Sequence, residues 1–257
     1  MPVANKLDLV FKGGKKNLLN IYCTAGFPAV DSLGEVIMAL QESGVDMIEV
    51  GMPYSDPIAD GPVIQQSNMS ALKNGMNISL MFQQLETIRD KVDIPLILMG
   101  YLNPVLQYGI ESFCLSAQKA GVSAVIIPDL PMYEYETLYQ KWFDKYGLKF
   151  IFLISPVTDN KRMQKADNLS SGFLYAVSSS SVTGQAAGHV NHAYFQMLKE
   201  APLKNPIMIG FGIHDKASFE TACSYARGAI IGSAYIKALS SGMPIREITK
   251  RFVSSII

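Results

Sequence analysis

The chain has 257 residues, of which 49% are hydrophobic and 17% are charged, and 22 Lys and Arg residues balance 22 Asp and Glu residues. This composition is typical of a globular protein with a large core, and the balanced charge argues against a protein that binds nucleic acid or an anionic membrane through a basic surface. No apolar run reaches the roughly 20 residues that span a bilayer, and the N-terminal residues lack the apolar stretch of a signal peptide.

Eight short apolar runs, rich in β-branched residues, follow one another along the chain. They are residues 19–24, 46–51, 94–100, 122–128, 148–155, 172–178, 206–212 and 228–233. Each run is apolar throughout, which is typical of parallel strands covered on both faces. The longer segments between them have helical spacing, and glycines follow three of the predicted helix ends, at Gly44, Gly121 and Gly242.

About eight strand-then-helix units in a chain of this length predict an α/β protein, a single (β/α)8 barrel over residues 1–257. A doubly wound sheet is the alternative. However, the sequence has no Walker A motif, and GFGIHD at 210–215 supplies only two glycines of a dinucleotide-binding loop. Because barrel chemistry takes place at the C-terminal ends of the strands, the residues that end each run are the candidates for a site.

The second run contains a carboxylate, Glu49, between Ile48 and Val50, and a Pro-rich loop with Asp56 and Asp60 follows it. Facing the helices, Glu49 would be buried without an obvious partner, at a cost in stability. Facing the barrel mouth, it would have a raised pKa that suits a general acid or base, and Asp60 could add a second carboxylate. A structural Glu hydrogen-bonded to backbone, and a loop cap at Asp60, remain alternatives.

The last two runs end in glycines that precede predicted helices, in GFGIHDKASFE and GAIIGSAYIKAL. Glycines let backbone approach a ligand, and the first N–H groups of a helix attract anions, so a phosphate site is predicted there, with VTGQAAG at 182–188 as a further contributor. The alternative is that these glycines only make turns. Four aromatic residues stand at strand ends and would suit a flat apolar ring, although each alone could be core: Tyr22, Tyr101, Tyr175 and Phe211.

The sequence offers little for a metal or for disulfides. Cys23, Cys114 and Cys223 lie far apart without a CxxC pair, so we expect free thiols and a cytoplasmic location. The three histidines have no Cys or HExxH partner, so we expect no metal site.

Seven segments, in this order, resemble the tryptophan synthase alpha subunit family: YCTAGFP, IEVGMPYSDPIADGPVIQ, IPLILMGYLNP, IIPDLP, YAVSSSSVTG, IGFGI and GAIIGSAYIK. The resemblance implies a (β/α)8 barrel that cleaves indole-3-glycerol phosphate to indole and glyceraldehyde 3-phosphate in tryptophan biosynthesis. This is a retro-aldol reaction without a metal or an organic cofactor. By the same resemblance, Glu49 is the catalytic acid–base and Asp60 is the second carboxylate, which accepts from the indole N–H.

The resemblance also implies the other site residues. The phosphate would rest on backbone around Gly184, Gly212, Gly232 and Ser233, with Phe211 nearby. The indole ring would lie among Tyr22, Met99, Ile126, Leu153 and Tyr175. Thr183 would bond Asp60 when the loop closes, and Asp129 would organise the loop after the second strand.

A partner is implied too, a pyridoxal-phosphate beta subunit in an α2β2 assembly, which receives the indole; the cofactor belongs to that partner. Four residues match positions that contact it: Pro53, Asp56, Pro57 and Asn103. The stretch Ser178–Ser181 departs from the family pattern, which usually has a larger side chain and a Gly there. Three alternatives remain: an alpha-like subunit that mainly activates a beta partner, a lyase without a partner, and another phosphate-binding barrel, which would need a catalytic Lys at a strand end.

Overall fold

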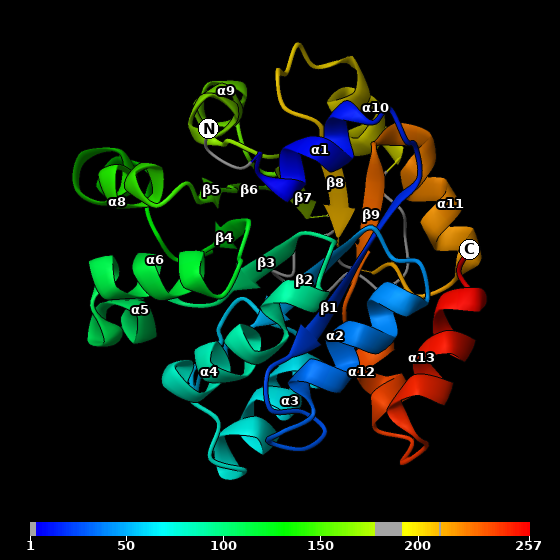
Figure 1. Cartoon of the computed structure of the whole chain (residues 1–257). Helices are drawn as coiled ribbons and strands as arrows, with labels where there is room; N and C mark the ends of the chain where they lie inside the picture. Colours follow the sequence, from blue (N-terminus) through cyan, green and yellow to red (C-terminus); the bar gives the residue numbers. More distant parts are fainter. Residues whose placement is uncertain (1–3, 178–191, 211) are drawn as a thin grey trace.

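The computed structural model describes residues 4–177, 192–210 and 212–257. Its strands are all parallel and form one sheet in the order β5-β4-β3-β2-β1-β9-β8-β7-β6 (Figure 1). The strands are β1 Leu18–Thr24, β2 Met47–Gly51, β3 Leu96–Met99, β4 Ala124–Ile126, β5 Lys149–Phe150, β6 Leu153–Ile154, β7 Leu174–Val177, β8 Ile207–Gly210 and β9 Gly228–Ile231.

The two edge strands of this order, β5 and β6, are halves of one predicted strand. β5 pairs with β4, β6 pairs with β7, and only Ile151 and Phe152 separate them along the chain. Backbone hydrogen bonds continue through the break, from Ile151 N to Val125 O at 3.1 Å and from Tyr175 N to Phe152 O at 3.1 Å. The sheet is therefore closed by the chain itself. The predicted (β/α)8 barrel is confirmed, and the doubly wound alternative is wrong.

Helices surround the sheet on its outer side, apart from α1, which lies across one end of the barrel (Figure 1). They are α1 Lys6–Lys12, α2 Leu33–Glu42, α3 Pro62–Lys73, α4 Ile78–Ile88, α5 Leu102–Tyr108, α6 Ile110–Lys119, α7 Met132–Glu134, α8 Gln140–Lys145, α9 Asn160–Leu169, α10 His192–Glu200, α11 Lys216–Tyr225, α12 Ser233–Leu239 and α13 Ile245–Ser254, with a 3-10 turn at Arg89–Lys91 and a π-helical segment at Tyr135–Tyr139. The predicted glycine stops after α2, α6 and α12 are confirmed. Gly44, Gly121 and Gly242 have φ of 90°, 76° and 75°, values that side chains rarely adopt.

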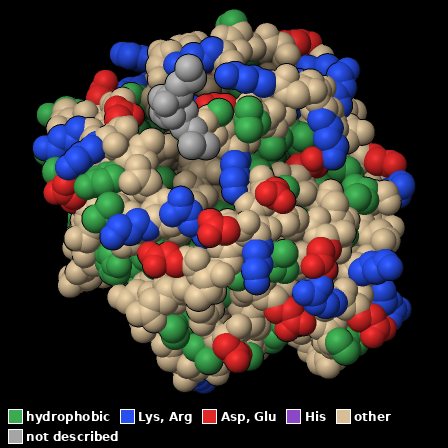
Figure 2. All heavy atoms as spheres, viewed as in Figure 1, with side chains coloured by type: hydrophobic (Ala, Val, Ile, Leu, Met, Phe, Trp, Pro, Cys, Tyr) green, Lys and Arg blue, Asp and Glu red, His purple; other side chains and the backbone are tan. Residues whose placement is uncertain are grey.

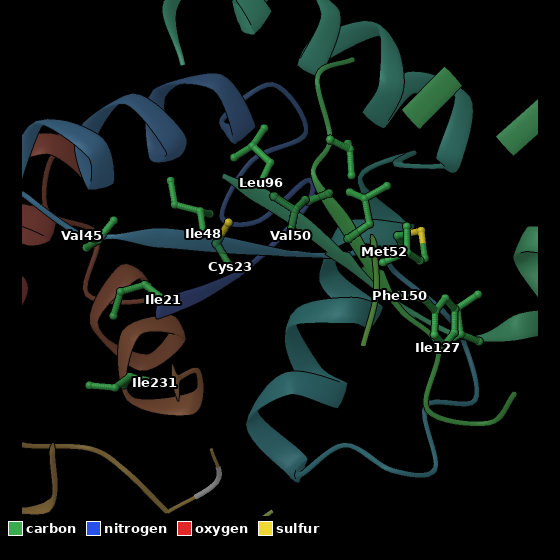
Figure 3. Close-up of a cluster of buried hydrophobic side chains, with 14 of the residues drawn as sticks. Ile21, Cys23, Val45, Ile48, Val50, Met52, Leu96, Ile127, Phe150 and Ile231 are labelled. Atoms are coloured by element: carbon green, nitrogen blue, oxygen red, sulfur yellow. The ribbon is translucent and has the colours of Figure 1, made fainter. Parts of the chain in front are cut away.

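The strands carry two separate apolar clusters, one on each face. The outer cluster packs against the helices and includes Ile21, Ile48 and Val50 (Figure 3). The inner cluster fills the barrel and includes Tyr22 and Met47. Because side chains alternate along a strand, Glu49 points to the same side as Met47, into the barrel.

Helix α1 covers the N-terminal end of the barrel. Leu7 is fully buried in the inner cluster, and the Phe11 ring lies 5.9 Å from the Phe173 ring. Just before the helix, Asn5 Nδ2 donates to the carbonyls of Ser123 and Gly147, at 2.9 and 3.2 Å. Since this end is covered, the C-terminal ends of the strands are the end of the barrel where a ligand can enter.

The face of the molecule shown in Figure 2 has no dominant charge of one sign. On the face in Figure 2, Lys and Arg side chains are interspersed with Asp and Glu side chains. Within the residues that the structure describes, none of the helices is long and apolar enough to cross a membrane.

Candidate active site at the C-terminal ends of the strands

Glu49 lies inside the barrel with only 1% of its surface exposed. Its Oε2 accepts a hydrogen bond from Asn20 Nδ2 on the neighbouring strand, at 3.3 Å. Burial raises the pKa of Glu49 to about 8; the Asn20 hydrogen bond acts in the opposite direction, and the charge of Asp60 adds to the rise. The structure therefore gives this carboxyl a side-chain partner, and the group can exchange a proton near neutral pH.

Asp60 lies in the loop between β2 and α3, where it is half-buried. Burial raises its pKa to about 6, against the effect of hydrogen bonds from the Tyr101 hydroxyl and from Asn68 Nδ2, which is 3.5 Å from Oδ2. Helix α3 begins at Pro62 with Gly61 as its N-cap residue and has no side-chain cap among the described residues. The loop-cap alternative for Asp60 is therefore wrong, and its carboxylate is directed to the tyrosine and the asparagine.

Tyr22 and Tyr175 extend over glycines on neighbouring strands. A Cβ added at Gly51 would clash with the Tyr22 hydroxyl, and one added at Gly210 would clash with the Tyr175 hydroxyl. Burial raises the pKa of both phenols well above the usual range, and the charges of Glu49 and Asp60 contribute to both shifts. The two carboxyls and the two phenols therefore lie close enough to interact electrostatically. The glycines leave the space that the rings occupy.

The other predicted ring contacts lie in the same layer. Met99 and Ile126 are opposite each other in the β3–β4 register, and Leu153 is opposite Tyr175. All four belong to the inner cluster or pack against it. These apolar residues and the two tyrosines surround the inner end of the site.

Tyr101 and Asp129 organise the loops above this layer. The Tyr101 hydroxyl accepts a hydrogen bond from Ala59 N at 3.0 Å, next to Asp60. Asp129 Oδ1 accepts from Leu102 N at 2.9 Å, at the start of α5. The hydrogen bond of Asp129 is thus to the loop after β3. Its charge also reaches Tyr101, whose pKa is raised by burial, by Asp60 and, to a smaller extent, by Asp129.

The structure describes some of the residues that are predicted to bind the phosphate. Gly212 follows β8 with φ of 77°, and Gly232 is the N-cap residue of α12, which starts at Ser233. Gly232 has no side chain that could cap α12, and the first N–H groups of a helix have no partner within it. Thr183, Gly184, Phe211 and the stretch 178–181 lie outside the described residues.

The predicted partner residues lie on the loops around the mouth. Asp56 and Asn103 are exposed, whereas Pro53 and Pro57 are buried. Ile58, which the sequence analysis did not single out, is 85% exposed, the largest exposure among the large apolar side chains that the structure describes. The loop after β2 therefore presents an apolar side chain to solvent.

Two polar residues of the site were missed from the sequence, Asn20 and Asn68. Both are buried and both donate to the carboxylates. Asn20 could have been found by the reasoning used for Glu49, since it is a polar residue inside an apolar run, two positions from Tyr22. Among the residues described, no group of three or more His, Cys, Asp or Glu side chains could hold a metal ion.

Comparisons with known proteins agree with the resemblance found in the sequence. Residues 10–253 match the family model described as tryptophan synthase alpha chain. The chain is 50% identical to the tryptophan synthase alpha chain of Flavobacterium psychrophilum over 243 residues, 94% of this chain and 95% of that one.

Solved structures agree as well. The fold is similar to the tryptophan synthase alpha chain of Legionella pneumophila, with a TM-score of 0.87, 31% identity, and coverage of 99% of this chain and 96% of that one. It is also similar to a chain of the tryptophan synthase complex of Pyrococcus furiosus, with a TM-score of 0.84, 30% identity, and coverage of 94% and 98%.

Proposed function

We propose that this chain, which belongs to the tryptophan synthase alpha chain family, cleaves indole-3-glycerol phosphate to indole and glyceraldehyde 3-phosphate. The observation that carries the proposal is the pair of carboxyls inside the barrel mouth. The pKa of Glu49 is raised to about 8 and that of Asp60 to about 6, so the two values lie on either side of neutral pH. Two carboxyls whose environments separate their pKa values in this way can act as an acid and an anion in one reaction.

At pH 7 Glu49 is mostly protonated and Asp60 is mostly ionised. The Glu49 proton is transferred to C3 of the indole ring, which leaves a carboxylate on Glu49 and a positive charge on the ring nitrogen. Asp60 accepts the hydrogen bond of the indole N–H and stabilises that charge. General acid–base assistance of this kind contributes about 10²–10⁴-fold.

The second step breaks the carbon–carbon bond. The Glu49 carboxylate removes the proton of the hydroxyl on the side-chain carbon attached to C3, and that carbon becomes the aldehyde of glyceraldehyde 3-phosphate. The electron pair of the broken bond returns to the ring and neutralises it as indole. Glu49 ends the cycle protonated, so the reaction consumes neither acid nor base.

The rest of the site supports this substrate. The inner layer of Tyr22, Met99 and Tyr175 provides apolar and aromatic surface for a flat ring. At the end of β9, the first N–H groups of α12 suit an anion, and in barrels a phosphate frequently binds after the last two strands. We propose that Gly212, Gly232 and Ser233 hold the phosphate through backbone N–H groups.

We also propose that the chain acts with a beta subunit in an α2β2 assembly, to which it passes indole. The structural similarity to a chain of a tryptophan synthase complex supports this, as does the exposed rim formed by Asp56, Ile58 and Asn103. Pyridoxal phosphate would belong to the beta subunit and not to this chain. The free thiols of the three cysteines suit the proposed cytoplasmic location.

The test is product analysis with the purified chain, alone and mixed with a beta subunit. We expect indole and glyceraldehyde 3-phosphate to form in equal amounts from indole-3-glycerol phosphate, faster with the beta subunit present. Activation of the beta subunit without any indole formed by this chain would support the scaffold alternative instead. An unchanged rate and no complex in gel filtration would identify a lyase that works without a partner.

A further inference from the structure

Asn20 lies one layer below Glu49 in the barrel interior. It is fully buried on β1, with Met47 and Ile230 opposite it on the neighbouring strands. Its inward neighbours on the same strand, Leu18 and Tyr22, belong to the inner apolar cluster. The amide therefore stands in apolar surroundings, and its Nδ2 is directed to Glu49 Oε2 at 3.3 Å.

The other half of the amide has no partner among the residues that the structure describes. In the described part of the chain, Asn20 Oδ1 is buried and receives no hydrogen bond. Burying an amide with an unsatisfied acceptor costs stability, and an apolar side chain of the same shape would avoid that cost. The contribution of Asn20 to folding therefore does not explain its presence, and its contact with Glu49 is the remaining explanation.

A carboxyl that changes its protonation state requires a hydrogen-bond donor when it is ionised and an acceptor when it is protonated. A primary amide offers both. When Glu49 is ionised, the Nδ2–H group donates to the carboxylate. When Glu49 is protonated, its O–H group can donate to an amide oxygen. A half-turn of the Asn20 amide exchanges Nδ2 for Oδ1, an acceptor that has no donor among the described residues. The amide itself does not titrate near neutral pH, so it can serve both states without competing for the proton.

We propose that Asn20 is a positioning residue for the reaction. It fixes the orientation of the Glu49 carboxyl and supports its ionised form through Nδ2 and its protonated form through Oδ1. This inference rests on the proposed function, because it gives Glu49 the task of releasing and regaining a proton in each cycle.

Other titratable groups also surround Glu49. Asp60 approaches from the loop after β2, Tyr22 and Cys23 from β1, and Tyr175 from β7; each is coupled electrostatically to Glu49. The effect of Asn20 must therefore be measured with these groups in place, by changing residue 20 alone.

The variant that tests the proposal is Asn20→Leu, which keeps the branched shape and removes both the donor and the acceptor. The matched control is Asn205→Leu. Asn205 precedes β8 at the opposite end of the barrel, and its amide donates to the carbonyls of Asp167 and Ser170 at 2.6 and 3.2 Å. The readouts are kcat and KM for indole-3-glycerol phosphate across pH, and the titration of the Glu49 carboxyl by ¹³C NMR, assigned by its absence in Glu49→Gln.

For Asn20→Leu we expect kcat to fall about 10-fold or more while KM changes by less than about 2-fold, because a hydrogen bond to a charged group is lost next to the reacting carboxyl. The Glu49 carboxyl should titrate at higher pH, since its ionised form has lost its donor. Asn205→Leu should lower the melting temperature without moving either the Glu49 titration or the pH profile. In the Glu49→Gln background, Asn20→Leu should cause little further loss.

If the Asn20→Leu variant does not fold, the smaller change Asn20→Asp is the second test. The introduced carboxyl should couple with Glu49, so that the pair titrates in two steps, one above the wild-type value. An unchanged Glu49 titration and unchanged kcat in both variants would overturn the role of Asn20. If Glu49→Gln kept wild-type activity, the role of Glu49 would fail, and if the wild type formed no indole the proposed function would fail; in both cases the NMR titration would still report whether Asn20 contacts Glu49.

Discussion

Replacing Glu49 by glutamine removes a carboxyl that the barrel keeps out of water, and this should stabilise the protein at alkaline pH. Burial raises the pKa of Glu49 from its ordinary 4.5 to about 8. Between these values the folded protein holds a proton that the unfolded chain has released. The free energy of unfolding of the wild type therefore falls as pH rises through this window and levels off above about pH 8. Glutamine does not titrate, so the free energy of unfolding of Glu49→Gln should not show this part of the fall with rising pH.

The size of the effect follows from the shift. One pKa unit corresponds to about 1.4 kcal/mol, so the rise of the Glu49 pKa from 4.5 to about 8 corresponds to a fall of about 5 kcal/mol in the free energy of unfolding. Roughly 2 kcal/mol of it falls between pH 6.5 and pH 9. Glutamine has the same size and can still accept the hydrogen bond from Asn20, so packing changes add little to this difference.

The measurement is urea unfolding at pH 6.5 and pH 9, followed by the fluorescence of Trp142, the only tryptophan. Between the two pH values, the free energy of unfolding should fall by about 2 kcal/mol more for the wild type than for Glu49→Gln. Glu86→Gln on the exposed side of α4 is the control and should behave as the wild type. Equal losses in wild type and Glu49→Gln would refute the reasoning, because the buried carboxyl would then not have a raised pKa.

Four further predictions concern activity, packing and assembly. The kcat/KM for indole-3-glycerol phosphate should rise as Asp60 loses its proton near pH 6 and fall as Glu49 loses its proton near pH 8; a flat profile from pH 5 to 9 would contradict the roles assigned to the pair. Asp60→Asn should lower kcat by about 10²–10³-fold, measured as indole release, because the ring cation loses its counter-charge. Gly51→Ala should cost about 1–3 kcal/mol of stability in thermal unfolding, since its Cβ would clash with the Tyr22 hydroxyl. Ile58→Asp should weaken binding to a beta subunit about 10-fold or more in a titration while leaving the melting temperature unchanged.

Much of the fold could be predicted from the sequence because each strand is buried on both faces. That burial produces eight continuous apolar runs, and the glycines at 44, 121 and 242 end helices where a left-handed residue is needed. The interruption of the fifth strand at Ile151 and Phe152 could not be predicted, since its residues are as apolar as the rest. The position of α1 under the barrel was missed too, because it depends on contacts such as Leu7 with Gly172, far apart in the chain.

The direction of the Glu49 side chain could not be predicted from the sequence. Met47, Ile48 and Val50 are all apolar, so alternation along β2 cannot be read from the sequence, and only the structure assigns Met47 to the inner cluster and Ile48 to the outer one. The contact with Asn20 was missed for a related reason. Asn20 could have been noticed as a polar residue inside an apolar run, but its partner could not, because the register that brings it near Glu49 is a property of the closed barrel.

The most direct test of the account is the single-turnover rate of indole formation from indole-3-glycerol phosphate, with enzyme in excess, for wild type and Glu49→Gln at pH 7. If the carboxyl inside the barrel delivers the proton to C3 and removes the hydroxyl proton, the variant should be at least about 10²-fold slower while still binding the substrate. A variant that forms indole within about 3-fold of the wild-type rate would show that another group moves these protons, and the assignment of Glu49 would be wrong.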